Sequence, residues 1–404
     1  MFLCFGAART SAQSTDEMSE KHFTVTAVPA ENGSYTVSPA LPADGRVPAG
    51  TTLTVTANPE PGYALDAVYY TVPGGMWGTT SYETFTPEMT LTVDTATSLG
   101  ATFVDAALVE DLNVTHDVIY AQPGVKPLKY DVYAPHGAAK LPGIVIVHGG
   151  GWSSNNEDIM RGLARELARE GRYVVFSIDY RWVNELDGDA TPNSMHQLIE
   201  DVFGAIAHIQ EHAGEYGLDP GRLAVTGDSA GGHLSAAAAV LSPLIGEGGF
   251  GKRPGVYQYR PSYVPEGKSV AQLREEIMGA VRAAAPSYGP FDAANFSMFV
   301  RQTDTAYRRA ISPIAHVPPA SERLLPHFIV RGTADPLIRD GAVQPYVTAL
   351  QEAGQPVEYV QVEGAGHAFF DWKPDAQTRA TFAEIGVPQA ARMRTFFDGV
   401  FYPQ

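Results

Sequence analysis

The chain has 404 residues, of which 44% are hydrophobic and 10% aromatic, and its formal net charge at pH 7 is −17. This length favours two folded domains, and the composition argues against a disordered chain. The negative charge argues against nucleic acid or an anionic membrane surface as a partner, and it disfavours a strongly anionic substrate. Cys4 is the only cysteine, which excludes an intrachain disulfide and a cysteine-based metal site.

The N-terminal residues 1–12 are apolar at first and then small. They match the end of a signal peptide cleaved near Ala12, or else a disordered terminus. No apolar run reaches the roughly 18 residues that span a bilayer. We therefore expect residues 1–22 to be a leader or a disordered terminus. We also expect the protein to be bacterial and to be secreted, periplasmic or held at the cell surface.

Residues 23–105 predict a small all-β domain. Apolar and polar residues alternate there with period two, and turn signals such as Asn32-Gly33 separate the alternating segments. The alternating segments are residues 23–28, 35–37, 52–56, 89–93 and 101–103.

Within this domain, the order of residues 32–39, 48–57, 61–63 and 100–103 resembles the divergent repeat modules of bacterial secreted and surface proteins, akin to the internalin B-repeat. The resemblance implies a spacer or a module for cell-surface or polysaccharide attachment. Carbohydrate binding is a sharper alternative, and its candidate stacking residues are Tyr69, Tyr70, Trp77 and Tyr82.

From residue 106 to 404, alternating strand and helix patterns predict one α/β domain with a mostly parallel sheet flanked by helices. Helical spacing covers residues 159–170 and 195–212. Two loop-like stretches, 244–268 and 295–321, interrupt the alternation and could form the wall or roof of a pocket. A buried strand is expected at residues 143–147, and further strands at residues 173–178, 222–226, 279–283, 327–331 and 357–362.

The segment Gly227-Asp228-Ser229-Ala230-Gly231 lies between a strand pattern and a run of small residues typical of a helix. Glycines on both sides of Ser229 allow a tight turn there, and a serine at a helix N-terminus lies close to backbone N–H groups that stabilise negative charge. This arrangement is a nucleophile elbow, so the sequence predicts Ser229 as a catalytic nucleophile.

A serine hydroxyl needs a base, and the base needs an anionic partner that orients it. His367 follows the expected strand at 357–362, and Asp335 follows the one at 327–331. Both residues are therefore expected at the same edge of the sheet as Ser229, in the order serine, aspartate, histidine. Alternative acids are Asp340, Glu363 and Asp371.

The glycine run in His148-Gly149-Gly150-Gly151-Trp152 follows another expected strand. Backbone N–H groups of such a run can converge on the oxyanion that forms during acyl transfer. We expect the oxyanion hole to consist of the N–H groups of Gly150, Gly151 and Ala230. His148 is expected to act as a hydrogen-bonding strut and not as a base.

Together these motifs resemble the hormone-sensitive-lipase-related α/β-hydrolases, and among them the bifunctional feruloyl and acetylxylan esterases. The resemblance covers roughly residues 115–395 and implies an α/β-hydrolase fold and a serine esterase that works through an acyl-enzyme. The stretch 153–158 departs from it, because it lacks the usual glycine-aspartate-lysine pattern. The matching segments are residues 131–135, 148–152, 179–181, 227–233, 288–292, 332–336 and 363–367.

The expected substrate is a small-molecule or polymer-linked ester of feruloyl, acetyl or another aryl type, including aromatic polyesters. Trp152, Tyr288 and Phe369 are the expected substrate-binding residues, and neither a metal nor a cofactor is implied. A serine peptidase or arylformamidase on the same fold is the alternative activity. A surface-attachment protein with an inactive hydrolase domain is the alternative of another class.

Overall fold

The computed structural model describes residues 21–75 and 78–403. The chain divides into two compact units, Met1–Glu110 and Asp111–Gln404, here called unit 1 and unit 2. Residues 1–20 of the leader or disordered terminus expected at 1–22, and the candidate stacking residue Trp77, lie outside the described residues, whereas His22 already begins the first strand. No helix in the described part of the chain is both long and apolar enough to cross a membrane.

Unit 1 consists of β-strands arranged in two sheets, with the strand orders β3-β1-β8-β5-β6 and β2-β4-β7. Every second residue of β4 is buried, at Leu53, Val55 and Ala57, and side chains from both sheets join them in one hydrophobic core. The strands are β1 (His22–Ala27), β2 (Gly33–Ser38), β3 (Arg46–Pro48), β4 (Thr51–Pro59), β5 (Tyr63–Pro73), β6 (Thr79–Thr84), β7 (Glu88–Val93) and β8 (Thr97–Asp105).

The aromatic residues of unit 1 have different environments. Tyr69 is buried in unit 1, whereas Tyr70 stacks on the exposed Tyr82 with ring centroids 4.8 Å apart. The strands β5 and β6 that carry these residues were not among the expected segments. The stacked pair therefore leaves an aromatic surface on unit 1, while Tyr69 belongs to its interior.

Unit 2 is built on one eight-stranded sheet with the order β16-β15-β14-β13-β11-β12-β10-β9. The strands from β11 to β16 pair in parallel, and β10 pairs antiparallel with both β9 and β12. The strands are β9 (Leu112–Ala121), β10 (Leu128–Pro135), β11 (Leu141–Val147), β12 (Val174–Ile178), β13 (Leu218–Asp228), β14 (Val281–Ser287), β15 (His327–Gly332) and β16 (Val357–Val362).

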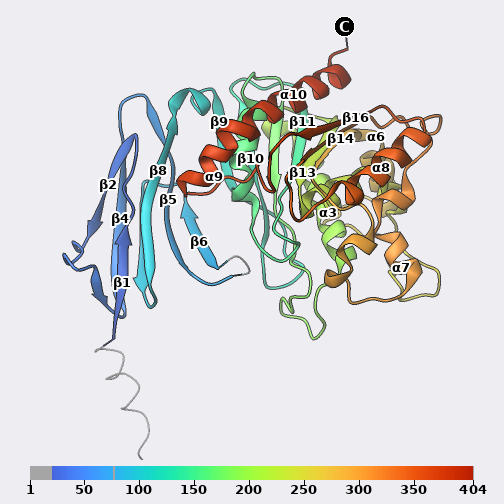
Figure 1. Ribbon diagram of the computed structural model, residues 1–404. Coiled ribbons are helices and arrows are strands. Elements are labelled where there is room, and N and C mark those ends of the chain that lie inside the picture. The colour runs from blue at the N-terminus through green and yellow to red at the C-terminus, as the bar shows by residue number, and fades with distance from the viewer. Residues whose placement is uncertain (1–20, 76–77, 404) are drawn as a thin grey trace, which may run out of the picture. The chain divides into compact units, whose positions relative to one another are not determined.

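Helices cover both faces of this sheet, and Figure 1 shows α3 and α10 on opposite sides of it. Successive residues of β11 alternate between the two cores, with Val145 on the side of α3 and Ile146 on the side of α10. The α-helices are α2 (Arg161–Ala168), α3 (Met195–Glu211), α4 (Ala213–Tyr216), α5 (Ala230–Val240), α6 (Val270–Ala280), α7 (Thr305–Ala310), α8 (Asp340–Glu352), α9 (Ala376–Thr381) and α10 (Val387–Phe401).

The α/β-hydrolase architecture expected from the sequence is confirmed, with two differences in detail. The strand expected at 279–283 begins only at Val281, because α6 continues to Ala280 and passes directly into β14. The two antiparallel strands at the sheet edge, β9 and β10, were not among the expected strands.

Candidate active site

Ser229 lies in the tight turn between β13 and α5, as the elbow motif predicts. Its φ is +53°, in the left-handed region, and its N–H donates to the carbonyl oxygen of Ser287 at 3.0 Å. A Cβ on Gly227 would lie 2.4 Å from the Val147 oxygen, and a Cβ on Gly231 would lie 1.9 Å from the same atom. Both glycines are therefore required for β11, β13 and α5 to approach each other this closely.

Ser229, His367 and Asp335 meet at one edge of the sheet. The Ser229 hydroxyl oxygen lies 2.9 Å from Nε2 of His367, and Nδ1 of the same ring lies 2.7 Å from Oδ2 of Asp335. In this geometry Nδ1–H donates to Asp335, which leaves Nε2 as an acceptor for the serine proton. The three residues come from the elbow, the loop after β15 and the loop after β16.

Asp335 is held as an ionised carboxylate by several donors. The N–H groups of Leu337 and Ile338 donate to its Oδ1 at 2.8 and 2.9 Å, and His367 binds Oδ2. Burial alone would raise the pKa of Asp335, but these hydrogen bonds outweigh it, so its pKa lies below the ordinary value. Of the alternative acids, Asp340 instead accepts a hydrogen bond from Tyr359.

Side chains hold two carbonyl groups of the glycine loop after β11. The Gly149 carbonyl is held by Nδ1 of His148 at 2.6 Å, and the Gly150 carbonyl by Oγ of Ser154 at 2.7 Å. In a planar trans peptide the next N–H points away from the carbonyl. The N–H groups of Gly150 and Gly151 therefore point away from these donors, and Gly150 and Gly151 both have positive φ values, +116° and +60°.

Ala230, the third expected oxyanion donor, is the first residue of α5. An N–H in the first turn of a helix has no carbonyl partner within that helix, so it is open to an anion. The oxyanion role of Gly150, Gly151 and Ala230 therefore stays a prediction that agrees with the local geometry.

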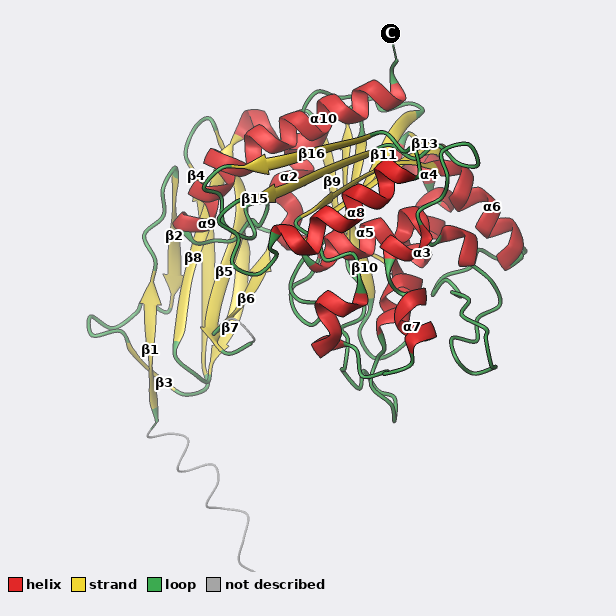
Figure 2. Cartoon of the chain, turned by 45° about the vertical axis from the view of Figure 1, so that its right-hand side comes forward, coloured by secondary structure: helices red, strands yellow, loops and turns green. Residues whose placement is uncertain are grey.

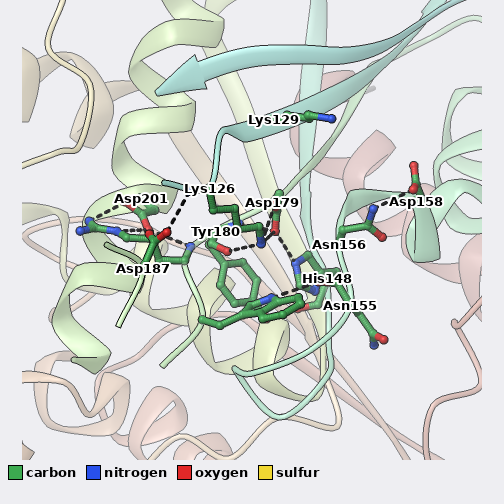
Figure 3. Close-up of polar contacts among 12 residues, drawn as sticks. Lys126, Lys129, His148, Asn155, Asn156, Asp158, Asp179, Tyr180, Asp187 and Asp201 are labelled. Carbon is green, nitrogen blue, oxygen red and sulfur yellow. Dashed lines mark hydrogen bonds and ion pairs between the residues drawn. The ribbon is translucent and has the colours of Figure 1, made fainter. Parts of the chain in front are cut away.

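His148 contacts Asp179 and Tyr180, and Figure 3 shows Lys126 and His148 both reaching Asp179. Nε2 of His148 lies 3.2 Å from Asp179, and Lys126 Nζ donates to the same carboxylate at 2.9 Å. The Tyr180 ring stacks on His148 with centroids 4.2 Å apart, and its hydroxyl donates to the His148 carbonyl. His148 is thus a strut, as expected.

Lys126 was not found by the sequence analysis, because a single lysine in a hairpin loop carries no pattern. Burial would raise the pKa of Asp179, but the charge of Lys126 and the hydrogen bond to His148 outweigh it and keep this pKa below the ordinary value. Lys126 therefore holds a fully buried carboxylate in its charged form. Through His148, that carboxylate positions the glycine loop Gly149-Gly150-Gly151, which is called the oxyanion loop below.

A second buried carboxyl, Asp228, precedes the nucleophile. Burial, and then the negative charge of Asp371, raise its pKa well above the ordinary value. Asp228 also approaches Gly149 of the oxyanion loop closely, since a Cβ on that glycine would lie 2.6 Å from Oδ2. Asp228 therefore packs between the elbow and the glycine loop, in surroundings that disfavour its charged form.

The three expected substrate-binding aromatics are almost fully buried, with 4% exposure for Trp152, 0% for Tyr288 and 1% for Phe369. The Trp152 indole N–H donates to His233, and the Tyr288 ring packs against both His367 and Phe369. Tyr288 thus packs beside the triad histidine, and all three aromatic side chains lie in the interior of unit 2 and do not form a surface open to a substrate.

Among the described residues, one group of carboxylates is close enough to hold a metal ion. Oxygen atoms of Asp131, Glu157 and Asp158 lie within 4.8 Å of one another. Asp131 already binds Nδ1 of His116 at 2.6 Å and the N–H of Asp117 at 2.9 Å. Asp131 is thus already engaged by neighbouring groups, and the cluster contains no residue of the triad.

Comparison with protein families gives one matching model, described as alpha/beta hydrolase fold, over residues 144–371. The chain is also similar to the probable carboxylic ester hydrolase LipM of Mycobacterium tuberculosis, at 29% identity over 56% of this chain and 49% of LipM. Carboxylesterase NlhH of the same organism is 31% identical over 54% of this chain and 63% of NlhH. The chain thus spans about half of LipM and less than two thirds of NlhH.

Among solved structures, Thermogutta terrifontis esterase 2 phosphoramylated by tabun superposes with a TM-score of 0.54. The superposition covers 73% of this chain and 98% of that one, at 23% sequence identity. At this level of identity the likeness supports the fold and nothing finer.

Proposed function

Because the chain belongs to the alpha/beta hydrolase family, whose model matches more than half of it, we propose that it is a serine carboxylic ester hydrolase. The observation that carries the proposal is the continuous line of hydrogen bonds from Asp335 through His367 to Ser229, at 2.7 and 2.9 Å. The names of LipM and NlhH, both ester hydrolases, add support.

In the proposed reaction, His367 Nε2 takes the hydroxyl proton as Ser229 Oγ attacks the carbonyl carbon of the ester. The carbonyl oxygen becomes an oxyanion, stabilised by the N–H groups of Gly150, Gly151 and Ala230. The bond to the alcohol then breaks, and His367 gives its proton to the leaving alcohol oxygen. Ser229 keeps the acyl group.

Water completes the cycle by the same steps in reverse order. His367 takes a proton from water, the resulting hydroxide attacks the acyl-enzyme, and the acid leaves as Ser229 regains its proton. Asp335 remains ionised throughout and stabilises the imidazolium form of His367, which agrees with its lowered pKa.

We extend the proposal to feruloyl, acetyl or other aryl esters, because the segments 148–152, 179–181 and 227–233 resemble esterases of that type. Export, and a role of unit 1 as an attachment module, belong to the same proposal. Export is proposed because residues 1–12 are apolar at first and then small, and attachment is proposed because of the β-rich pattern of unit 1.

The proposal is tested with 4-nitrophenyl acetate, methyl ferulate and the anilide of ferulic acid. We expect both esters to be cleaved, and Ser229→Ala to lower kcat by a factor of about 10⁴ or more. Paraoxon should add one covalent phosphoryl group to the wild-type chain and none to the variant, as measured by mass spectrometry.

The matched control is Ser321→Ala at an exposed serine, which should behave as wild type. If Ser229→Ala keeps the wild-type rate, the proposed function is wrong. If the anilide is cleaved faster than the esters, the peptidase or arylformamidase alternative replaces it.

A further inference from the structure

Unit 2 contains a cavity of about 990 Å³ whose lining includes none of the triad residues. Its volume is at the upper end of the range for ligand pockets. Pro123 and three segments line it: the stretch from Arg181 to Glu200, the insert from Glu247 to Ser262, and the short stretch from Phe299 to Gln302. The last two belong to the loops that interrupt the α/β alternation in the sequence.

The insert is fastened to the rest of unit 2. The Phe250 ring stacks on His196 at the start of α3, with centroids 4.6 Å apart and an angle of 4°. The Tyr259 hydroxyl donates to the carbonyl oxygen of Ala310, and the Arg260 N–H donates to Glu200. These contacts make the insert a fixed wall of the cavity. Figure 2 shows α7 and the long loops together at one end of unit 2.

Positive charge gathers in this cavity although the whole chain carries −17. Of its five cationic side chains, Arg181 pairs with Asp201 at 2.7 Å and Arg260 with Glu247 at 2.7 Å. The other three have no carboxylate within ion-pair distance in the part of the chain that the structure describes. They are Lys252, Arg253 and Arg301.

Little negative charge is available in the cavity to offset these three cations. Besides the paired Glu247, the acidic lining residues are Asp189 and Glu200. Burial raises the pKa of Glu200 to about 7, so this side chain is partly uncharged near neutral pH. The N-terminus of α3 also lines the cavity and adds a partial positive charge.

The cavity lies close to the oxyanion loop. The Phe299 ring, in its wall, is 5.0 Å from the ring of Trp152, and the N–H of Val183, also in its wall, donates to the Trp152 carbonyl at 2.8 Å. Trp152 directly follows Gly151. One aromatic side chain therefore separates the cavity wall from the expected oxyanion donors.

We propose that this cavity binds the carboxylate of an anionic ester substrate, that is, an ester whose acyl or alcohol part ends in a carboxylate group. The inference rests on the proposed esterase function and adds a substrate class to it. Guanidinium groups bind carboxylates through paired charge-assisted hydrogen bonds, and the exposed side chains of Lys252, Arg253 and Arg301 are accessible to a carboxylate that enters from solvent. The local charge thus favours an anionic group that the net charge of the chain alone would disfavour.

The test uses two matched pairs of esters. The acyl-side pair is the 4-nitrophenyl monoester of adipic acid against 4-nitrophenyl hexanoate, and the alcohol-side pair is 4-acetoxycinnamate against 4-acetoxycinnamamide. We expect the anionic member of one pair to have a kcat/KM higher by about tenfold or more, mainly through a lower KM. Added salt should reduce this preference.

The test variant combines Lys252→Gln, Arg253→Gln and Arg301→Gln, and it should lose the preference while cleaving the neutral esters within about twofold of the wild-type rate. The control combines Lys140→Gln, Arg282→Gln and Arg392→Gln. These are exposed cations outside the cavity, so the control removes the same amount of charge. It should keep the preference, which separates local binding from general attraction.

Failure of the inference differs from failure of the proposed function. If neutral esters are cleaved but neither pair shows an anionic preference, or if the test variant retains it, the cavity proposal is wrong and the esterase proposal stands. If no ester is cleaved, calorimetric titration with adipate and 4-hydroxycinnamate decides. Binding that the test variant loses and the control keeps supports the carboxylate site, and absence of binding to the wild-type chain overturns it.

Discussion

Lys126 reaches the oxyanion loop from the hairpin between β9 and β10, through Asp179 and His148. Each link has a defined task. Lys126 keeps the buried Asp179 ionised, Asp179 holds the His148 ring, and His148 fixes the carbonyl of Gly149. Because that peptide also carries the N–H of Gly150, a charge at a distant hairpin helps to determine where an oxyanion donor points.

Replacing Lys126 by methionine should lower kcat by about tenfold while KM changes by less than about twofold, because the oxyanion exists only after binding. The lone buried carboxylate should also lower the free energy of unfolding by about 3 kcal/mol or more. The measurements are steady-state kinetics on 4-nitrophenyl acetate and urea unfolding.

Lys129→Met is the matched control, because Lys129 pairs with the exposed Asp117 and not with the oxyanion network. A loss of stability in Lys126→Met without any change in kcat would limit Lys126 to a structural role. Equal losses of kcat in both variants would exclude a specific effect on the oxyanion loop.

At the scale of elements, the sequence pattern could predict those parts of the site that lie within one short loop or turn after a strand. The elbow around Ser229 and the loops that carry Asp335 and His367 each follow a segment with a strand pattern in an alternating strand and helix order, so their common edge could be inferred. The Lys126 network and the cavity could not, because their residues lie far apart in sequence. Whether Arg253 or Arg301 has an ion-pair partner depends on tertiary structure alone.

The contact between α5 and β11 allows a prediction about a single methyl group. Gly231→Ala would place Cβ 1.9 Å from the Val147 oxygen and 2.6 Å from the His148 oxygen, both at the start of the oxyanion loop. We expect a loss of about 3 kcal/mol or more in the free energy of unfolding, together with a lower kcat. Urea unfolding and ester kinetics measure the two effects.

Gly279→Ala provides the comparison in the same kind of element. This glycine lies in α6, and a Cβ there would meet no atom within 4 Å. Its replacement should leave activity unchanged and stabilise the protein by about 0.5–1 kcal/mol. If both alanine variants have the same free energy of unfolding, the close approach of α5 and β11 does not require a glycine at position 231.

At the scale of the whole molecule, the two units have separate interiors. The hydrophobic core of unit 1 draws on residues from Phe23 to Phe103, and those of unit 2 begin at Leu112. All residues of the triad and of the expected oxyanion hole belong to unit 2. A domain of this size buries enough surface to fold alone.

A chain of residues 111–404 should therefore fold and cleave 4-nitrophenyl acetate with a kcat/KM within about twofold of the full chain, since the reacting groups are all retained. If unit 1 attaches the enzyme to polysaccharide, the same truncation should lower the release of ferulate from insoluble feruloylated arabinoxylan. Circular dichroism and ester kinetics check the first expectation, and product release from the solid checks the second. A folded truncated chain without activity on the soluble ester would show that unit 1 contributes to the reaction itself, whereas equal rates on the solid would remove the attachment role.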